Sequence, residues 1–206
     1  MNRSSLAGIG ALAFGVLMIV GLIVENAPGG SYSANDVADY VRSGHRPLVF
    51  VALYLGALGV VGLVFLLARL RAAIADSALA SIFWGLGLAA AGAITAGYAL
   101  TTAVPIAMGY GGNGVTLDAP VTFVFSETGW VVMTGGCILL GSALLTFARA
   151  AVSVPGWVRW STVVAGVAAI AAAAWFPLAL LILWALAIGI WLLAARPAPT
   201  VAAVTG

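Results

Sequence analysis

Long apolar runs separated by short polar segments dominate the chain. The runs predict helices over about 6–24, 48–68, 79–104, 121–148, 159–175 and 178–195. A helix needs about 20 residues to cross the roughly 30 Å hydrocarbon core of a bilayer. The pattern therefore predicts an all-α polytopic membrane protein, a single domain over residues 1–206 with a six-transmembrane-helix bundle.

Two regions of this pattern need a further argument. The uncharged stretch from Trp160 to Ala195 would be roughly 54 Å long as one helix, too long for a single crossing. Trp175 and Pro177 favour a turn within it, because tryptophan suits the membrane interface and proline suits the first turn of a helix. The run at 6–24 exceeds the about 7–15 apolar residues of a secretory signal and predicts a retained helix.

The polar segment 25–47 predicts a short outer-surface helix over about 34–43, between the first two transmembrane helices. Ser33 and Asp36 have the spacing of a capping box. An apolar stripe at helical spacing follows, formed by Val37, Tyr40 and Val41. We expect this amphipathic helix to lie on the outer membrane surface. The glycine-rich segment 105–120 predicts a mobile outer loop.

Composition indicates that lipid surrounds most of the chain. Of 206 residues, 64% are hydrophobic and 7% are charged, against roughly 25% charged in soluble domains. The formal charge is +2, and no basic tract exists that could hold nucleic acid. The one cysteine, Cys137, excludes an intrachain disulfide and cysteine-based metal motifs, and we expect it to be an inert core residue.

Arginine placement predicts the orientation, because cytoplasmic segments of membrane proteins carry an excess of positive charge. With six crossings, one side holds Arg3, Arg69, Arg71, Arg149, Arg159 and Arg196. The other side holds Arg42 and Arg46 with most of the acids, Glu25, Asp36, Asp39 and Asp118. A topology of five crossings would lose this agreement. The use of arginine without lysine is typical of a GC-rich bacterial genome, so we predict a multi-pass protein of the bacterial inner membrane with both termini cytoplasmic.

Small residues at regular spacing mark candidate helix contacts, since helices in lipid approach closely at glycine and alanine. One such line is Gly85, Ala89, Ala93 and Gly97, and another is Ala7, Ala11 and Gly15. In a chain so rich in small residues, chance spacing is the alternative.

Glu127 is the one carboxylate inside a predicted transmembrane run, and its depth decides what it can do. Counting about 20 residues back from Ala148, beside the cytoplasmic Arg149, reaches Gly129, so Glu127 falls at the outer edge of the hydrocarbon. There it either simply reaches water or belongs to a polar pocket in the outer half of the bundle. In the second case we expect it to pair with Arg46 or Arg42, because a half-buried carboxylate favours an opposite charge.

The outer ends of the predicted helices carry further polar side chains that would line such a pocket beneath the 25–47 segment. Together with Glu127, the candidate ligand-binding residues are Tyr54, Tyr98, Thr101, Thr102, Thr128, Arg42, His45 and Arg46. A single histidine beside an arginine in a loop is otherwise typical of a surface residue.

No catalytic or cofactor motif is present. The chain has no H-E-x-x-H, P-loop or G-x-S-x-G sequence, no lysine to carry retinal, and one histidine, which excludes bis-histidine haem ligation. Glu25, Asp36, Asp39 and His45 would be the groups to gather around a cation, but their spacing matches no known metal site. We therefore expect no metal, no cofactor and no catalytic residue.

The stretches SANDVADYVRSGHRPLVFVALYLGALGVVGLVFLLARLRAA (33–73), VPGWVRW (154–160) and LLAARP (192–197) resemble segments of a family of bacterial six-helix integral membrane proteins of unknown function. In that family a short helix ending in a tyrosine-containing turn precedes the second helix, and an arginine pair closes it. Here these residues would be Tyr40, Arg69 and Arg71. The resemblance covers most of the chain and implies a topology without an activity.

Three functions fit these features. The first is non-catalytic binding of a small amphiphile or a membrane-protein partner through the outer-half pocket. The second is a small permease or channel subunit, acting as an oligomer. The third is an intramembrane enzyme acting on lipid or quinone, with Glu127 as base and Tyr98 or Tyr54 as acid. A pocket that opens outward and is closed below would favour binding, whereas a polar track reaching Arg69 or Arg149 would favour transport.

Overall fold

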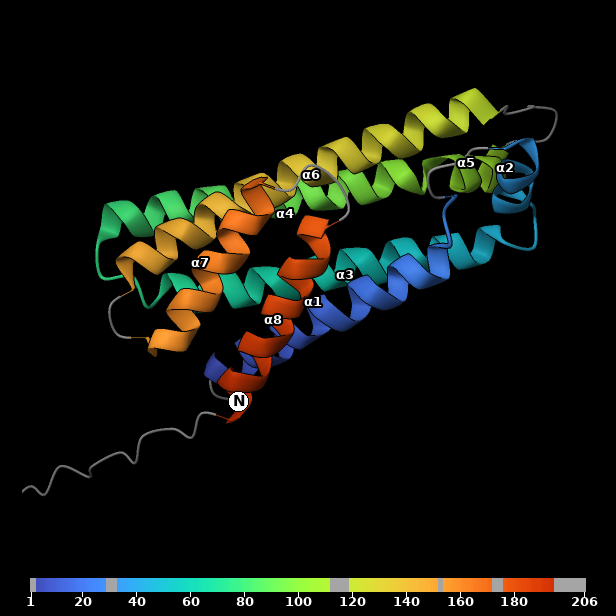
Figure 1. Cartoon of the computed structure of the whole chain (residues 1–206). Helices are drawn as coiled ribbons and strands as arrows, with labels where there is room; N and C mark the ends of the chain where they lie inside the picture. The colour runs from blue at the N-terminus through green and yellow to red at the C-terminus, as the bar shows by residue number, and fades with distance from the viewer. Residues whose placement is uncertain (1–2, 29–32, 112–118, 152–153, 172–175, 195–206) are drawn as a thin grey trace, which may run out of the picture.

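The structure is a computed structural model that describes residues 3–28, 33–111, 119–151, 154–171 and 176–194. Within these residues the chain forms eight helices and no strand, which confirms the all-α class. Four long helices run along the molecule, and they are α1 (Arg3–Glu25), α3 (Arg46–Arg71), α4 (Ser77–Thr101) and α6 (Ala119–Ala150) (Figure 1). Four shorter helices complete the fold: α2 (Ala34–Val41), α5 (Ala103–Gly111), α7 (Gly156–Ala171) and α8 (Phe176–Ala194).

The four long helices are each long and apolar enough to cross a membrane, as a membrane protein requires. The last two predicted helices are also present, but α7 has 16 residues and α8 has 19. At 1.5 Å per residue α7 spans about 24 Å, less than the thickness of the hydrocarbon core. The count of six crossings therefore stays a prediction.

Two antiparallel helix pairs form the core. The most extensive contacts are those of α1 with α3 and of α4 with α6, while α7 packs on α6 and α8 on α1. Large apolar side chains fill the interior, among them the fully buried Phe14, Met18, Leu63, Phe83, Ile94, Leu140 and Phe147. The second pair approaches closely, since a Cβ atom built on Gly97 would lie 2.6 Å from the carbonyl oxygen of Gly129. Glycine is required where backbones come this near.

The predicted lines of small residues have different outcomes. On α1, Ala7 and Ala11 are buried and Gly15 contacts α8, as predicted. On α4 only Gly97 lies at a close contact, because Gly85 faces open space. Positions four residues apart rotate around the helix by about 40° at each step, so a line over three steps leaves the contact face.

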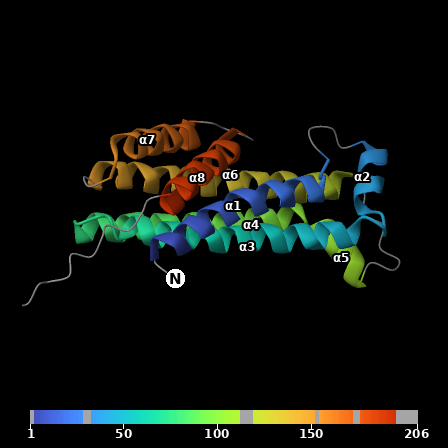
Figure 2. The ribbon, with the colours of Figure 1, turned by 90° about the horizontal axis from the view of Figure 1, so that it is seen from below.

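Helix α2 begins where the sequence predicts. The Ser33 hydroxyl accepts a hydrogen bond from the Asp36 N–H at 3.2 Å and donates to the Asp36 carboxylate at 2.6 Å. The apolar stripe of α2 buries Val37 and Tyr40 against the protein itself, because the helix lies across one end of the bundle and contacts α5 and α6 (Figure 2). The stripe therefore packs on protein rather than on the lipid surface that we expected.

The predicted helix 79–104 is divided. Helix α4 ends at Thr101, and α5 starts at Ala103 and runs to Gly111, so most of α5 lies in the segment predicted as a mobile loop. Pro105 has no N–H and cannot donate to the carbonyl of Thr101 four residues earlier, so the helical hydrogen bonding is interrupted here. Residues 112–118 of the predicted loop lie outside the described residues.

Candidate functional site

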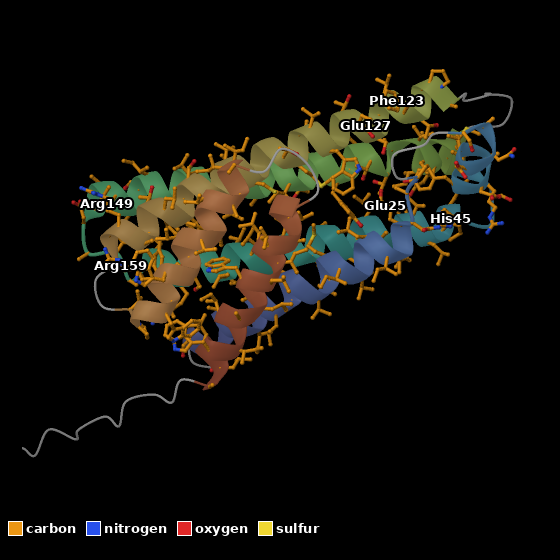
Figure 3. All side chains as sticks on the ribbon, viewed as in Figure 1. Glu25, His45, Phe123, Glu127, Arg149 and Arg159 are labelled. Carbon is orange, nitrogen blue, oxygen red and sulfur yellow. The ribbon has the colours of Figure 1, made fainter. Side chains whose placement is uncertain are left out.

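Buried polar side chains gather at the end of the bundle that carries α2. The buried polar residues in the described ranges are Glu25, His45, Thr101, Thr102, Thr122, Ser126 and Thr162. Thr162 lies in α7, where it accepts a hydrogen bond from the Trp184 indole at 3.1 Å. The others belong to α1, α4, α6, the junction of α4 with α5 or the turn after α2, and Figure 3 shows Glu25 and His45 at this end. Such a cluster in an apolar bundle is the strongest candidate for a site.

Glu25 lies at the centre of this cluster. It is the last residue of α1 and only 2% exposed. Its carboxylate accepts a hydrogen bond from the Tyr40 hydroxyl at 3.3 Å, and the side chains of Tyr98 and Thr101 lie beside it. The chain turns away at Asn26, whose φ of 44° is in the left-handed region that asparagine tolerates after a helix end.

Tyr98 reaches the cluster from α4 by passing between α1 and α3. A Cβ atom on Gly56 would lie 2.5 Å from the tyrosine ring, and one on Gly21 would lie 2.8 Å from the hydroxyl, so both glycines make room for Tyr98. The hydroxyls of Tyr98 and of Ser126 are buried and make no well-formed hydrogen bond within the described part of the chain. Buried polar groups of this kind are uncommon in proteins.

Tyr40 joins α2 to the break between α4 and α5. Its hydroxyl donates to the carbonyl oxygen of Thr101 at 3.0 Å, the acceptor that Pro105 leaves without a helical donor. The hydroxyl has one proton, so the longer contact to Glu25 is a shared second interaction, or a hydrogen bond that the carboxyl donates when it is protonated. The tyrosine thus satisfies two groups that an apolar environment would otherwise penalise.

His45 and Arg46 satisfy carbonyl groups at three other helix ends. The His45 Nε2 atom lies 2.9 Å from the carbonyl oxygen of Glu25 at the end of α1 and serves as the donor. Arg46 donates from Nε to Val41 at 2.8 Å and from Nη1 to Met108 at 2.9 Å, which ties the end of α2 to α5. We call Tyr40, His45 and Arg46 the capping residues, because helix-end carbonyls lack intrahelical donors.

The capping role changes the interpretation of His45. The sequence suggested a surface residue, yet the side chain is 9% exposed and contacts the Tyr40 ring with a centroid separation of 5.7 Å. His45 is buried because the turn after α2 folds it back over the end of α1.

The predicted ion pair of Glu127 is not formed with either described arginine. Arg42 pairs with Asp39 at 3.9 Å on the surface of α2, and Arg46 donates to the two carbonyls given above. Glu127 is half-buried on α6 (Figure 3). The partners of the two arginines are instead the Asp39 carboxylate for Arg42 and carbonyl oxygens at the ends of α2 and α5 for Arg46.

The other candidate residues separate into two groups. Tyr98, Thr101 and Thr102 are buried, and the first two lie beside Glu25. Tyr54 is 57% exposed on α3, where its ring lies 5.1 Å from that of Phe50, and Thr128 is exposed on α6. The sequence therefore identified the α4 side of the cluster but missed Glu25 and Tyr40 as its centre.

Two cavities flank the turn that follows α2. A polar cavity of about 430 Å³ is lined by α2 and the segment after α1, with Asp36, Asp39, Tyr40, Arg42 and His45 among its residues. A groove of about 540 Å³ lies between α3 and α5 and is lined by Ser43, Arg46, Pro47, Phe50, Val51, Pro105, Ile106, Gly109 and Tyr110. No group of three or more His, Cys, Asp or Glu side chains in the described ranges is placed to hold a metal ion.

Comparison with protein-family models, with curated proteins and with solved structures finds no match for the chain. The resemblance to bacterial six-helix membrane proteins of unknown function stays a prediction.

Proposed function

We propose that the protein binds a small amphiphile, without catalysis, in the groove between α3 and α5. In this proposal it is a multi-pass protein of the bacterial inner membrane, with six crossings and cytoplasmic termini, and the α2 end faces outward. The observation that carries the proposal is the pairing, in one groove, of an apolar wall with a fixed arginine.

The groove has the chemistry of an amphiphile site. The apolar and aromatic walls of the groove are formed by Phe50, Val51, Ile106 and Tyr110. The ring centroids of Phe50 and Tyr110 are 6.1 Å apart. Arg46 and Ser43 supply the polar groups. The groove volume of about 540 Å³ is that of a small-molecule site. An acyl or isoprenoid chain would lie against the rings, with a polar head near Arg46.

Arg46 is suited to an anionic or strongly accepting head. A guanidinium has five N–H donors in a fixed fork. Two of them go to the carbonyls of Val41 and Met108, which hold the side chain in one orientation. The remaining donors are available to a ligand from a position that is already ordered, so little conformational entropy is lost on binding.

The interior supports binding over transport. Below the polar cluster the one buried polar residue in the described ranges is Thr162, which is bonded to Trp184. The other buried residues there are apolar, with Phe14, Met18, Leu63, Leu140 and Phe147 fully buried. This core separates the cavities at the α2 end from Arg69 and Arg149, as expected for a pocket closed below. An enzyme would also need a substrate to reach Glu25, which Tyr40 and His45 cover.

Photolabelling of the full-length protein in lipid nanodiscs tests the proposal. The probe is a palmitate analogue with a diazirine in its chain, and labelled peptides are identified by mass spectrometry. We expect labelling to concentrate on residues of α3 and α5 that line the groove. Unlabelled palmitate should compete about tenfold better than hexadecanol, because a charge-assisted hydrogen bond to Arg46 contributes on the order of 1.5 kcal/mol.

A matched pair of variants provides the control. Val51→Trp fills the groove, whereas Val61→Trp adds the same bulk to another half-exposed position of α3. We expect labelling of α5 to be lost in the first variant and kept in the second. Uniform labelling along the lipid-exposed helices, unchanged by Val51→Trp, would contradict the proposal.

A further inference from the structure

A second cavity with charged walls lies at the opposite end of the bundle, between α6 and α7. It has a volume of about 450 Å³ and is lined by Leu145, Ala148, Arg149, Arg159, Trp160 and Val163. Figure 3 places Arg149 and Arg159 at the end of the molecule far from Glu25 and His45. Neither the capping residues nor the α3–α5 groove takes part in it.

The register of the two helices brings the arginines together. Helices α6 and α7 cross closely where a Cβ atom on Gly141 would lie 2.7 Å from the carbonyl oxygen of Gly166. The helices are consecutive and antiparallel, so moving eight residues from Gly141 toward the end of α6 reaches Arg149, and moving seven residues back from Gly166 reaches Arg159. Both arginines therefore lie about 11–12 Å from the crossing, on opposite walls of one cavity.

The guanidinium groups of Arg149 and Arg159 differ in their contacts from those of Arg71 and Arg46. Arg71 lies over the Trp84 ring at 5.6 Å, and Arg46 donates to two carbonyls. Arg149 and Arg159 have no hydrogen bond or ion pair to another described residue. Arg159 also lies in the first turn of α7, where the helix dipole disfavours a cation. An anion between the two side chains would stabilise this arrangement.

The residues around the arginines indicate a lipid rather than a dissolved anion. Trp160 lines the cavity and is 70% exposed, which is typical of an indole at the level of lipid headgroups. Beyond it, Val164 and Val167 form an exposed apolar surface on α7 that an acyl chain would cover. Basic pockets between transmembrane helices on the cytoplasmic side commonly bind anionic headgroups.

We infer that the cavity between α6 and α7 is a binding site for an anionic phospholipid. Arg149 and Arg159 bind the phosphate from two sides, and the Trp160 indole lies beside the glycerol region. One acyl chain packs along the exposed apolar surface of α7. The inference does not depend on the amphiphile site, because the two sites share no residue.

Native mass spectrometry of the full-length protein, released from detergent micelles, tests this inference. The probes are dioleoyl phosphatidylglycerol and dioleoyl phosphatidylcholine, which have the same chains and differ in headgroup charge. We expect the wild-type protein to retain phosphatidylglycerol preferentially. Arg149→Gln and Arg159→Gln should each lower that preference about fivefold, and the double variant by about 25-fold.

Arg71→Gln is the matched control, since it removes a guanidinium at the same end that lies over a tryptophan instead of the cavity. We expect its preference to stay within about twofold of wild type. An unchanged preference in the double variant, with its unfolding temperature preserved, overturns the inference. So does displacement of phosphatidylglycerol by inorganic phosphate, which would identify a site for a soluble anion. If the double variant does not fold, the two single variants decide.

Discussion

At the α2 end of the bundle, polar side chains from distant parts of the chain satisfy one another: Tyr40 and His45 both contact Glu25, and Arg46 donates to two carbonyls. At the opposite end, Arg149 and Arg159 line a cavity, and neither side chain has a hydrogen-bond or ion-pair partner among the described residues. The first arrangement fixes helices to each other and leaves only the remaining donors of Arg46 for a ligand. The second leaves both guanidinium groups without a protein acceptor among the described residues, so the two ends differ in how much of their polar capacity the fold itself uses.

Breaking the approach of α4 to α6 should have the largest effect on the α2 end. In Gly97→Leu the new side chain would meet the backbone of Gly129 and Met133, so the helices must separate and move Thr101 away from Tyr40. We expect a loss of about 3 kcal/mol in the free energy of unfolding. Thermal unfolding followed by tryptophan fluorescence in detergent measures it. Gly92→Leu, on the same helix with open space around it, should unfold like wild type; equal losses in both variants would count against the close contact.

Removing one hydroxyl from the capping residues should have a smaller effect. Tyr40→Phe leaves the carbonyl of Thr101 without its donor and removes one polar contact of the Glu25 carboxylate, and we expect a cost of about 1.5 kcal/mol. Tyr54→Phe removes the same group from an exposed ring and should change stability by less than about 0.5 kcal/mol. Chemical denaturation in mixed micelles distinguishes these values. Similar midpoints for the two variants would mean that the Tyr40 contacts contribute nothing.

The smallest expected changes in stability come from replacing one arginine at each end of the bundle. Arg46→Gln loses two hydrogen bonds to helix-end carbonyls and should destabilise the protein by about 1 kcal/mol. Arg149→Gln loses no contact to a described residue and should cost less than about 0.5 kcal/mol in detergent without anionic lipid. Adding phosphatidylglycerol should raise the unfolding temperature of wild type more than that of Arg149→Gln. The reverse order of stabilities would remove the distinction between the two ends.

The elements of the fold were predictable from the sequence because apolar runs and local caps depend on neighbours in the chain. All six apolar helices and the short helix at 34–41 are present, and Ser33 caps α2 as its spacing with Asp36 indicates. The division at Thr102 was missed, although Pro105 carries the signal, since a proline removes the donor for the residue four positions earlier.

The centre of the candidate site was not predictable in the same way. Glu25 appeared to be a loop acid because it ends an apolar run, and its burial depends on Tyr40 and Thr101, which meet it only after the chain folds back. Glu127 drew attention because it interrupts an apolar run, yet the arginines expected to pair with it have other acceptors. Sequence spacing reports which side chains share a helix face but not which helix ends converge.

The contact between Tyr40 and Thr101 also orders events during biogenesis. The two residues are 61 positions apart, so the hydroxyl has no acceptor there until α4 has been synthesised and inserted beside α1 and α3. Because Tyr98 and Thr101 of α4 also lie beside Glu25, we expect its carboxylate to be more accessible to water before that step. Insertion of α4 therefore completes the contacts around Glu25, and an insertion intermediate stalled before residue 101 would be recognisable by a Glu25 side chain that carbodiimides still modify.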